Sequence, residues 1–261
     1  MALSIVMECV MERLKTEEKR SQMKCFLGRT RRCDGAIRPL DVAVIVCVVA
    51  VIAFLAVIGT RHFQKHSLRT QCLRNLSQLG TALQLYAQDN HGLLPDCSRS
   101  NPRFAGPVWP WDLNTNLASV LEAKGADRKV FYCPANPAMN DDRHWNFWKN
   151  IPGSSTRVVS YGTLYRGIQQ VPSNLWRTKL GESGTGSPAQ TELSFDATAC
   201  VNEDYRDIRG IWSDRSNHMG DKSPTGGNIL FLDQHVQWRD FSEMRERFST
   251  VGPGGLVRWS F

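Results

Sequence analysis

A group of histidine and aspartate residues near the C-terminus could bind a divalent cation. The group comprises His218, Asp221, Asp233 and His235, and imidazole and carboxylate groups are common metal ligands. The same residues fit a structural interpretation, in which Asp233 forms a turn and His218 is a hydrogen-bonded loop residue. Spacing by itself does not specify a metal, so the structural interpretation is favoured. We predict no bound metal and keep His218 with Asp233 as the candidate pair to be tested.

The sequence contains no familiar catalytic motif. It lacks the G-x-S-x-G elbow of hydrolases, the H-E-x-x-H zinc motif and the glycine-rich phosphate loop. His62 and His66 have no carboxylate close to them in the sequence. We therefore predict a protein that is not an enzyme and that has no cofactor.

Two tryptophans mark a candidate binding loop. Trp145 and Trp148 lie in the aromatic run HWNFW, which has the composition of a loop. Their rings could stack on a sugar or dock a protein. The alternative is that they pack in the core of a small domain, which needs no partner, and this alternative is favoured.

The cysteines after residue 60 are four in number: Cys72, Cys97, Cys133 and Cys200. None has the C-x-x-C spacing of common zinc sites, which argues against zinc. An even number fits an oxidising compartment with up to two disulfides, in three alternative pairings. Four unrelated buried thiols are the other interpretation.

The most apolar segment of the chain precedes these residues. Residues 42–59 contain no charge, and as a helix they would extend about 27 Å, close to the thickness of a bilayer's hydrocarbon core. A cleaved secretory signal has a shorter apolar core of about 7–15 residues and a small-residue cleavage site, which is missing here. We predict a retained transmembrane helix over residues 37–60.

The apolar pattern continues as one face of an amphipathic helix over residues 61–92. The face comprises Leu68, Cys72, Leu76, Leu79, Leu83 and Tyr86, at the spacings of three and four that define a helical face. Asp89 to Gly92 and then Pro95 end the pattern. Residues 93–261 are expected to form a head domain, with a helix at 114–124, short strands at 130–132, 157–162 and 191–195, and a hairpin that turns at Asp233 and Gln234.

The remaining composition limits the function classes. Residues 1–36 form a basic leader, expected to be cleaved or partly untranslated because Met7, Met11 and Met23 are alternative starts. The net charge of +7 is spread along the chain. Because no basic stripe alternates with aromatic residues, nucleic acid is not an expected partner.

Four segments together resemble a known family. They are the block CLRNLSQLGTALQLYAQDNHG at 72–92, YCP at 132–134, SYG at 160–162 and GNILFLDQHVQW at 227–238. In this order, after an apolar helix, they are similar to the prepilin-type proteins with an N-terminal cleavage/methylation helix and a processing-associated C-terminal domain. That family has a histidine followed nine residues later by Asp-Gly. Here fourteen residues separate His218 from Asp233, and Gln234 replaces the glycine.

The resemblance implies an α+β, pilin-like fold. A long N-terminal helix, with a membrane half and an amphipathic half, would pack on a small antiparallel sheet head. Cleavage would fall between Ala36 and Ile37, and Asp41 would be the acidic fifth residue of the product. Asp41 would then pair with the N-terminal amine of a neighbouring subunit. Alternatively, it is an interfacial carboxylate favoured by the helix dipole.

The two cysteines within the shared segments are predicted to form a disulfide. Cys72 lies on the helical face that is expected to pack under the head, and Cys133 lies where an expected strand meets Pro134. A bond between them would tie the helix to the sheet. Two buried free thiols are the alternative.

These observations lead to a functional hypothesis. The protein is expected to be a non-enzymatic, membrane-anchored pilin- or pseudopilin-like subunit or accessory of a type II secretion or type IV pilus-like system. Its partners would be a membrane, a prepilin peptidase and other pilin-like subunits. It would cross the inner membrane once, with a periplasmic or extracellular head. The alternatives are an anchored envelope-binding protein that uses Trp145 and Trp148, and an anchored metal-dependent hydrolase built on His218 and Asp233.

Overall fold

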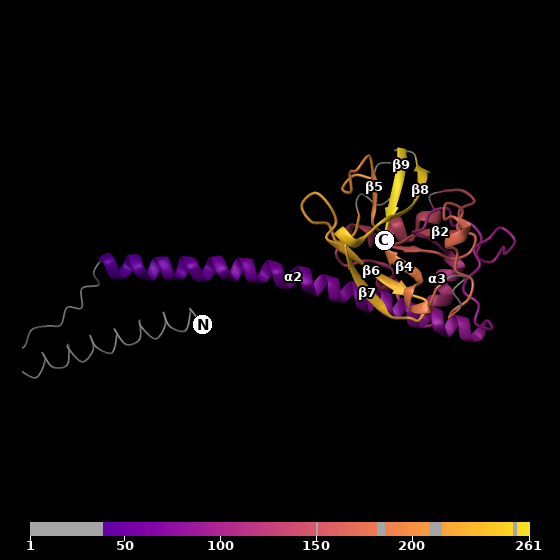
Figure 1. The fold of residues 1–261 in the computed structure, drawn as a ribbon, viewed down its shortest axis with the longest axis horizontal. Coiled ribbons are helices and arrows are strands. Elements are labelled where there is room, and N and C mark those ends of the chain that lie inside the picture. The colour runs from indigo at the N-terminus through magenta and orange to yellow at the C-terminus, as the bar shows by residue number, and fades with distance from the viewer. Residues whose placement is uncertain (1–38, 150, 182–185, 209–215, 253–254) are drawn as a thin grey trace, which may run out of the picture. The chain divides into compact units, whose positions relative to one another are not determined.

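The computed structural model describes residues 39–149, 151–181, 186–208, 216–252 and 255–261. The chain divides into two compact units, residues 1–56 and residues 57–261, and each is described by itself. The first helix with described residues, α2, begins at Pro39 and ends at Asp89, so it contributes to both units (Figure 1).

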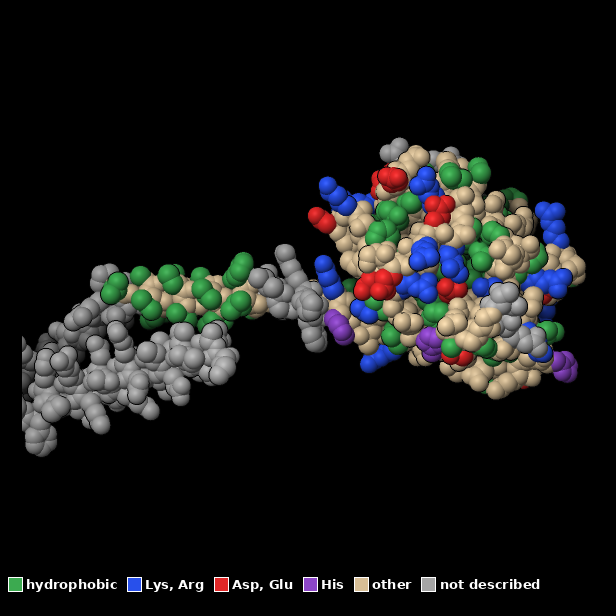
Figure 2. Space-filling view, viewed as in Figure 1, with side chains coloured by type: hydrophobic (Ala, Val, Ile, Leu, Met, Phe, Trp, Pro, Cys, Tyr) green, Lys and Arg blue, Asp and Glu red, His purple; other side chains and the backbone are tan. Residues whose placement is uncertain are grey.

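In the first unit, α2 is apolar on every side. Residues 42–56 contain no polar or charged side chain, and all of them are exposed. Figure 2 shows hydrophobic side chains along the visible side of this segment. Among the described residues, no helix has a stretch both long and apolar enough to cross a membrane.

In the second unit, α2 is apolar on one face only. Cys72, Leu76 and Leu83 are completely buried there, and their spacings of four and seven residues place them on a single face. The helix stops because His91 and Gly92 both adopt left-handed backbone conformations. The amide of Gly92 then donates to the carbonyl of Ala87, which satisfies a carbonyl of the last turn.

This buried face packs against a four-stranded antiparallel sheet of order β3-β4-β6-β7 (Figure 1). The strands are β3 (Tyr161–Thr163), β4 (Glu192–Asp196), β6 (Gly226–Phe231) and β7 (Val236–Asp240). Strand β6 is buried at every residue because it lies between β4 and β7. The Asn228 side chain of β6 donates to the backbone carbonyl of Arg69 in α2, so helix and sheet are joined by a polar contact as well.

Two further antiparallel sheets complete the second unit. One has the order β5-β9-β8, and the other pairs β1 with β2. The elements are β1 (Asp112–Asn114), β2 (Thr156–Val158), β5 (Ala199–Val201), β8 (Glu246–Gly252), β9 (Gly255–Ser260), α3 (Thr115–Glu122), α4 (Asp142–Trp145) and short 3₁₀ helices. The core between the sheets is aromatic, with the Phe195 and Phe261 rings stacked at 4.0 Å and Trp111 4.5 Å from Trp259.

The predicted fold class is corrected by the structure. The second unit is a mixed α and β structure with three separate antiparallel sheets, where a single small sheet head is expected. The expected membrane half of the long helix is likewise not found among the described residues. The strand patterns in the sequence are too short to show how many sheets they form, because strand partners are chosen by tertiary packing.

Local predictions had mixed outcomes. The helix at 114–124 is confirmed as α3, whose N-cap is the Asn114 side chain, accepting from the amides of Asn116 and Leu117. The expected strand at 130–132 is wrong, because Val130 and Phe131 belong to the 3₁₀ helix η1 (Arg128–Phe131) and Tyr132 is its C-cap. The Asp127 side chain caps η1 by accepting from the Lys129 amide, which outweighs the strand preference of Val130 and Phe131.

Candidate functional site

Four polar side chains from distant parts of the sequence meet inside the second unit. They are Cys72, Cys133, Asp196 and His218, and one potential ligand atom of each lies within 4.8 Å of all the others. All four are buried. We call this group the Cys₂AspHis cluster.

Each member is positioned by a different element. Cys72 lies on the buried face of α2, and Cys133 follows η1 by two residues. Asp196 is the last residue of β4, where it lies opposite Tyr161 of β3. His218 lies in the connection that leads to β6.

The backbone at His218 is held in an uncommon conformation. Its φ angle of 46° lies in the left-handed region, which costs energy for a residue other than glycine. Two hydrogen bonds from Thr225, from the amide at 2.9 Å and the hydroxyl at 3.0 Å, hold the His218 carbonyl. The ring meets Trp238 edge to face, with centroids 5.1 Å apart. These contacts direct the imidazole toward the cluster.

The contacts in the cluster converge on the Asp196 carboxylate and one imidazole nitrogen. The Cys72 thiol donates to the two carboxylate oxygens of Asp196, at 3.2 and 3.1 Å. The Nε2 atom of His218 lies 3.2 Å from Asp196 Oδ2 and 3.3 Å from Cys133 Sγ. The same ring nitrogen thus faces both the carboxylate and a sulfur.

Further polar groups surround Asp196 and Cys72. The Asn217 side-chain amide donates to Asp196 Oδ1 at 2.9 Å, and the backbone amide of Asn228 donates to Oδ2 at 2.7 Å. The Tyr161 hydroxyl lies 3.4 Å from Cys72 Sγ. Glycine is required beside this group, since a Cβ atom at Gly227 would lie 2.9 Å from the Cβ of Asp196.

Burial and nearby charges shift the pKa values of the cluster residues in opposite directions. Burial raises the pKa of Asp196, but the charge and hydrogen bond of His218 and the Asn228 amide bring it below its usual value. Burial lowers the pKa of His218, and Asp196 more than compensates, so this pKa is raised. In the thiol pair, burial and Cys72 raise the pKa of Cys133. Burial also acts to raise the pKa of Cys72, but hydrogen bonds from Cys133 and His218 bring it down.

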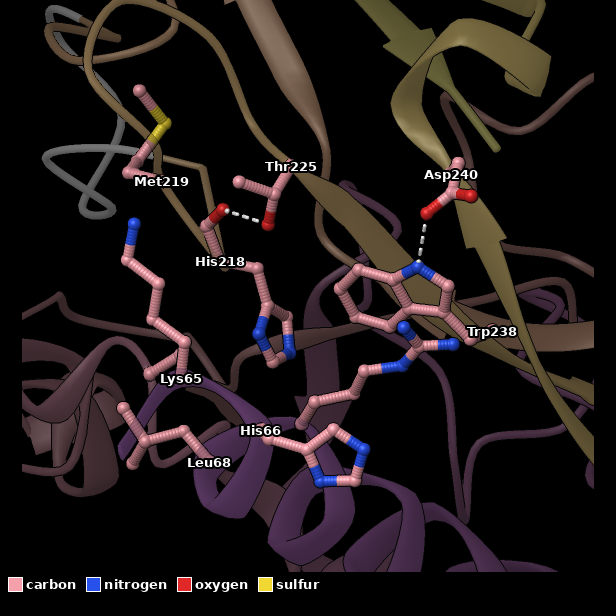
Figure 3. A pocket seen from close by; sticks show the side chains of 10 residues that line it. Lys65, His66, Leu68, His218, Met219, Thr225, Trp238 and Asp240 are labelled. Carbon is pink, nitrogen blue, oxygen red and sulfur yellow. Dashed lines mark hydrogen bonds between the residues drawn. The ribbon is translucent and has the colours of Figure 1, made fainter. Parts of the chain in front are cut away.

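A pocket of about 300 Å³ opens beside the cluster (Figure 3). His218 and Trp238 form part of its lining, together with Lys65 and His66 from α2. The guanidinium of Arg69 lies 4.1 Å from the centre of the Trp238 ring system. Trp238 in turn donates from its indole nitrogen to Asp240. His218 is therefore the cluster member that faces this pocket.

The geometry does not fit a cysteine–histidine–aspartate catalytic relay. In such a relay the imidazole uses one nitrogen toward the nucleophile and the other toward the carboxylate. Here Nε2 of His218 faces both Cys133 and Asp196. Cys72 and Cys133 are also completely buried, so no substrate could reach their sulfur atoms in this state. Convergence of four donor atoms on one point is instead the arrangement that holds a metal ion.

The structure assigns new partners to the candidate pair from the sequence. His218 lies in the cluster, but its carboxylate partner is Asp196. Asp233 pairs with His235 in the turn between β6 and β7, where both are partly exposed. Sequence reasoning missed Asp196, and the signal available was a single acidic residue at the end of an apolar strand.

The other predicted site residues have varied positions. Cys72 and Cys133 are brought together as free thiols, and a disulfide between them stays a prediction. Trp145 packs on the Arg157 guanidinium at 3.9 Å and on Phe131 at 5.8 Å, whereas Trp148 is partly exposed. The predicted loop therefore does not present two free rings side by side.

The predicted processing site cannot be placed. Ala36 and Ile37 lie outside the described residues, and Asp41 belongs to α2 with its side chain outside the described part. Comparisons with family models, curated proteins and solved structures found no match to this chain. The resemblance to prepilin-type proteins thus stays a prediction.

Proposed function

We propose that this protein is a non-enzymatic structural subunit of a membrane-associated assembly of the type II secretion or type IV pilus kind. The observation that supports the proposal is the apolar segment of α2 at residues 42–56. Its large side chains are about half exposed or more, for example Ile45 at 60% and Phe54 at 66%. A segment with this composition needs an apolar surrounding.

The energetic reason is the amount of apolar surface. Ten Val, Ile, Leu and Phe side chains of this segment are exposed: Val42, Val44, Ile45, Val46, Val48, Val49, Val51, Ile52, Phe54 and Leu55. Burial of a fully exposed side chain of this kind contributes about 1.5–3 kcal/mol. Because these side chains are about half to two-thirds exposed, covering the segment contributes roughly 8–20 kcal/mol before ordering costs. We infer that the same segment of neighbouring copies provides part of that cover, at a membrane.

The segment carries a natural probe for this arrangement. Cys47 is exposed and lies within it. In a chain whose Cys9, Cys25 and Cys33 are replaced by serine, a thiol-specific cross-linker applied to membranes should give covalent dimers. Cys47→Ser should remove them. A matched control is Gln84→Cys in the Cys47→Ser chain, because Gln84 is exposed on α2 in the second unit and should not cross-link efficiently.

A second measurement tests the apolar contact itself. Ile45→Arg with Ile52→Arg should release the chain from the assembly and shift it to monomer in sedimentation. Gln84→Arg, on the polar face of the same helix, should leave the assembly intact. If Cys47 gives no dimers and the double arginine variant behaves as the unmodified chain does, the proposal is wrong.

A further inference from the structure

We propose that the Cys₂AspHis cluster is a structural zinc site that joins α2 to the sheet. Two thiolates, one imidazole and one carboxylate form a ligand set that zinc accepts in tetrahedral geometry. The four residues come from four separate segments, so one ion would fix all of them to a common point. This inference is independent of the assembly role proposed above.

The distances between the ligand atoms fit one small ion. Zinc bonds of about 2.3 Å to sulfur and about 2.0–2.1 Å to nitrogen or oxygen place tetrahedral ligands about 3.3–3.8 Å apart. Three of the six separations are 3.1 Å for Cys72 and Asp196, 3.2 Å for His218 and Asp196, and 3.3 Å for Cys133 and His218, and the other three are within 4.8 Å. Outward shifts of a few tenths of an ångström open the site, and the thiols and the imidazole release their protons when the ion binds.

The surroundings suit the charge of a bound ion. Zn²⁺ with two thiolates, one carboxylate and a neutral imidazole leaves one net negative charge. The donors around the ligands face this charge, namely the Asn217 side-chain amide, the Asn228 backbone amide and the Tyr161 hydroxyl. Hydrogen bonds of this kind orient ligands and hold them ready for the metal.

A disulfide accounts for only half of this arrangement. A bond between Cys72 and Cys133 would use the two sulfur atoms and would give no reason for a buried carboxylate and an imidazole to point at the same place. A metal ion uses all four groups. Because the four ligands fill the tetrahedral positions, the site is structural and not catalytic, since catalytic zinc keeps one position for water or substrate.

Two pockets border the cluster. His218 lines the pocket of Figure 3, and Cys133 lines a second pocket together with Gln71 and Asn75 of α2. His218 and Cys133 thus each line a pocket that residues of α2 also line.

Metal content and cobalt spectroscopy of the full chain test the proposal. Purified under anaerobic conditions with reductant and without chelator, the chain should contain about one zinc per molecule by mass spectrometry. Replacement by Co²⁺ should give a thiolate-to-cobalt charge-transfer band and the visible bands of tetrahedral cobalt. Cys72→Ser and Cys133→Ser should each lose these bands. Cys97→Ser and Cys200→Ser are matched controls, because both remove buried thiols outside the cluster.

Three results would overturn the proposal. The first is a reduced wild-type chain that binds no stoichiometric zinc, or that gives a cobalt spectrum without thiolate bands. The second is metal content unchanged in the chain with both cluster cysteines replaced. The third is a native chain in which peptide mapping finds the Cys72–Cys133 disulfide and no zinc. If the serine variants do not fold, the thiolate bands of wild-type cobalt protein decide.

Discussion

The pairs His218–Asp196 and His235–Asp233 contain the same two residue types and differ in every physical respect that matters for stability. The side chains of the first pair are 5% and 0% exposed, and those of the second pair are 40% and 35% exposed. The first joins segments 22 positions apart, whereas the second lies within one turn. Residue type and closeness in sequence therefore do not show which pair contributes more to stability, whereas burial does.

The largest effect is expected from a substitution that breaks the buried His218–Asp196 pair. Asp196→Asn, measured by urea unfolding with chelator and reductant present, should lower the free energy of unfolding by about 3–5 kcal/mol. The reason is that the buried His218 loses the carboxylate that favours its charged form, and the donors around position 196 lose a charged acceptor. If the loss is below about 1 kcal/mol, the buried pair is no more important than a surface pair, and the comparison fails.

A third carboxylate, that of Asp112, shows how burial changes a pKa when no histidine partner is present. Asp112 is buried and accepts from the amides of Val108 and Trp109, and burial raises its pKa to about 6. The folded state then holds a proton more tightly than the unfolded state, whose pKa is 3.8. Asp112 therefore costs stability as pH rises from about 4 to about 7, by roughly 2–3 kcal/mol.

Asp112→Asn tests that pH dependence. The asparagine cannot ionise, so the free energy of unfolding of the variant should rise relative to that of the wild-type chain by about 2–3 kcal/mol as pH rises across this interval. The measurement is urea unfolding of both chains at several pH values, with the difference plotted against pH. A flat difference would mean that Asp112 keeps its ordinary pKa, and that burial alone does not separate it from Asp196.

The sequence predicted the helical side of the cluster better than its sheet side. The spacing that includes Cys72 and Leu76 predicts one buried helix face, and these residues are buried. Asp196 could not be predicted in the same way, since its contacts lie 124 positions before it at Cys72 and 32 positions after it at Asn228. Such contacts depend on how the sheet pairs, and short strands do not encode their partners locally.

The same limit explains why the sequence groups His218 with Asp233. Asp233 and His235 stand close to His218 in sequence, and sequence proximity is the only distance available before the fold is known. In the structure, the turn between β6 and β7 has its own local hydrogen bond, from the His235 amide to Asp233 at 3.2 Å. A polar group that is satisfied within its own turn does not need to reach a distant site.

A smaller effect is expected from the donors that surround the buried pair. The Asn217 side-chain amide donates to Asp196 Oδ1 and, at 2.7 Å, to the carbonyl of Ser160. Asn217→Ala should lower the free energy of unfolding by about 1–3 kcal/mol, because both acceptors are buried and lose a partner. Urea unfolding provides the measurement, and Asn116→Ala is a control because its side chain makes an exposed contact with Arg103. Equal losses in the two variants would show that the network around Asp196 adds nothing.

The smallest expected effect is at the exposed pair. Asp233→Asn removes the charge that attracts His235, and the two partners are more than one-third solvent-exposed, so water screens their attraction. Asparagine also keeps an oxygen that can accept from the His235 amide and tolerates turn conformations well. The free energy of unfolding should fall by at most about 0.5–1 kcal/mol, and the metal content should equal that of the wild-type chain. Urea unfolding and metal analysis of this variant beside Asp196→Asn check both statements. A loss as large as that of Asp196→Asn would show that the exposed pair contributes as much to stability as the buried pair, which contradicts the ranking.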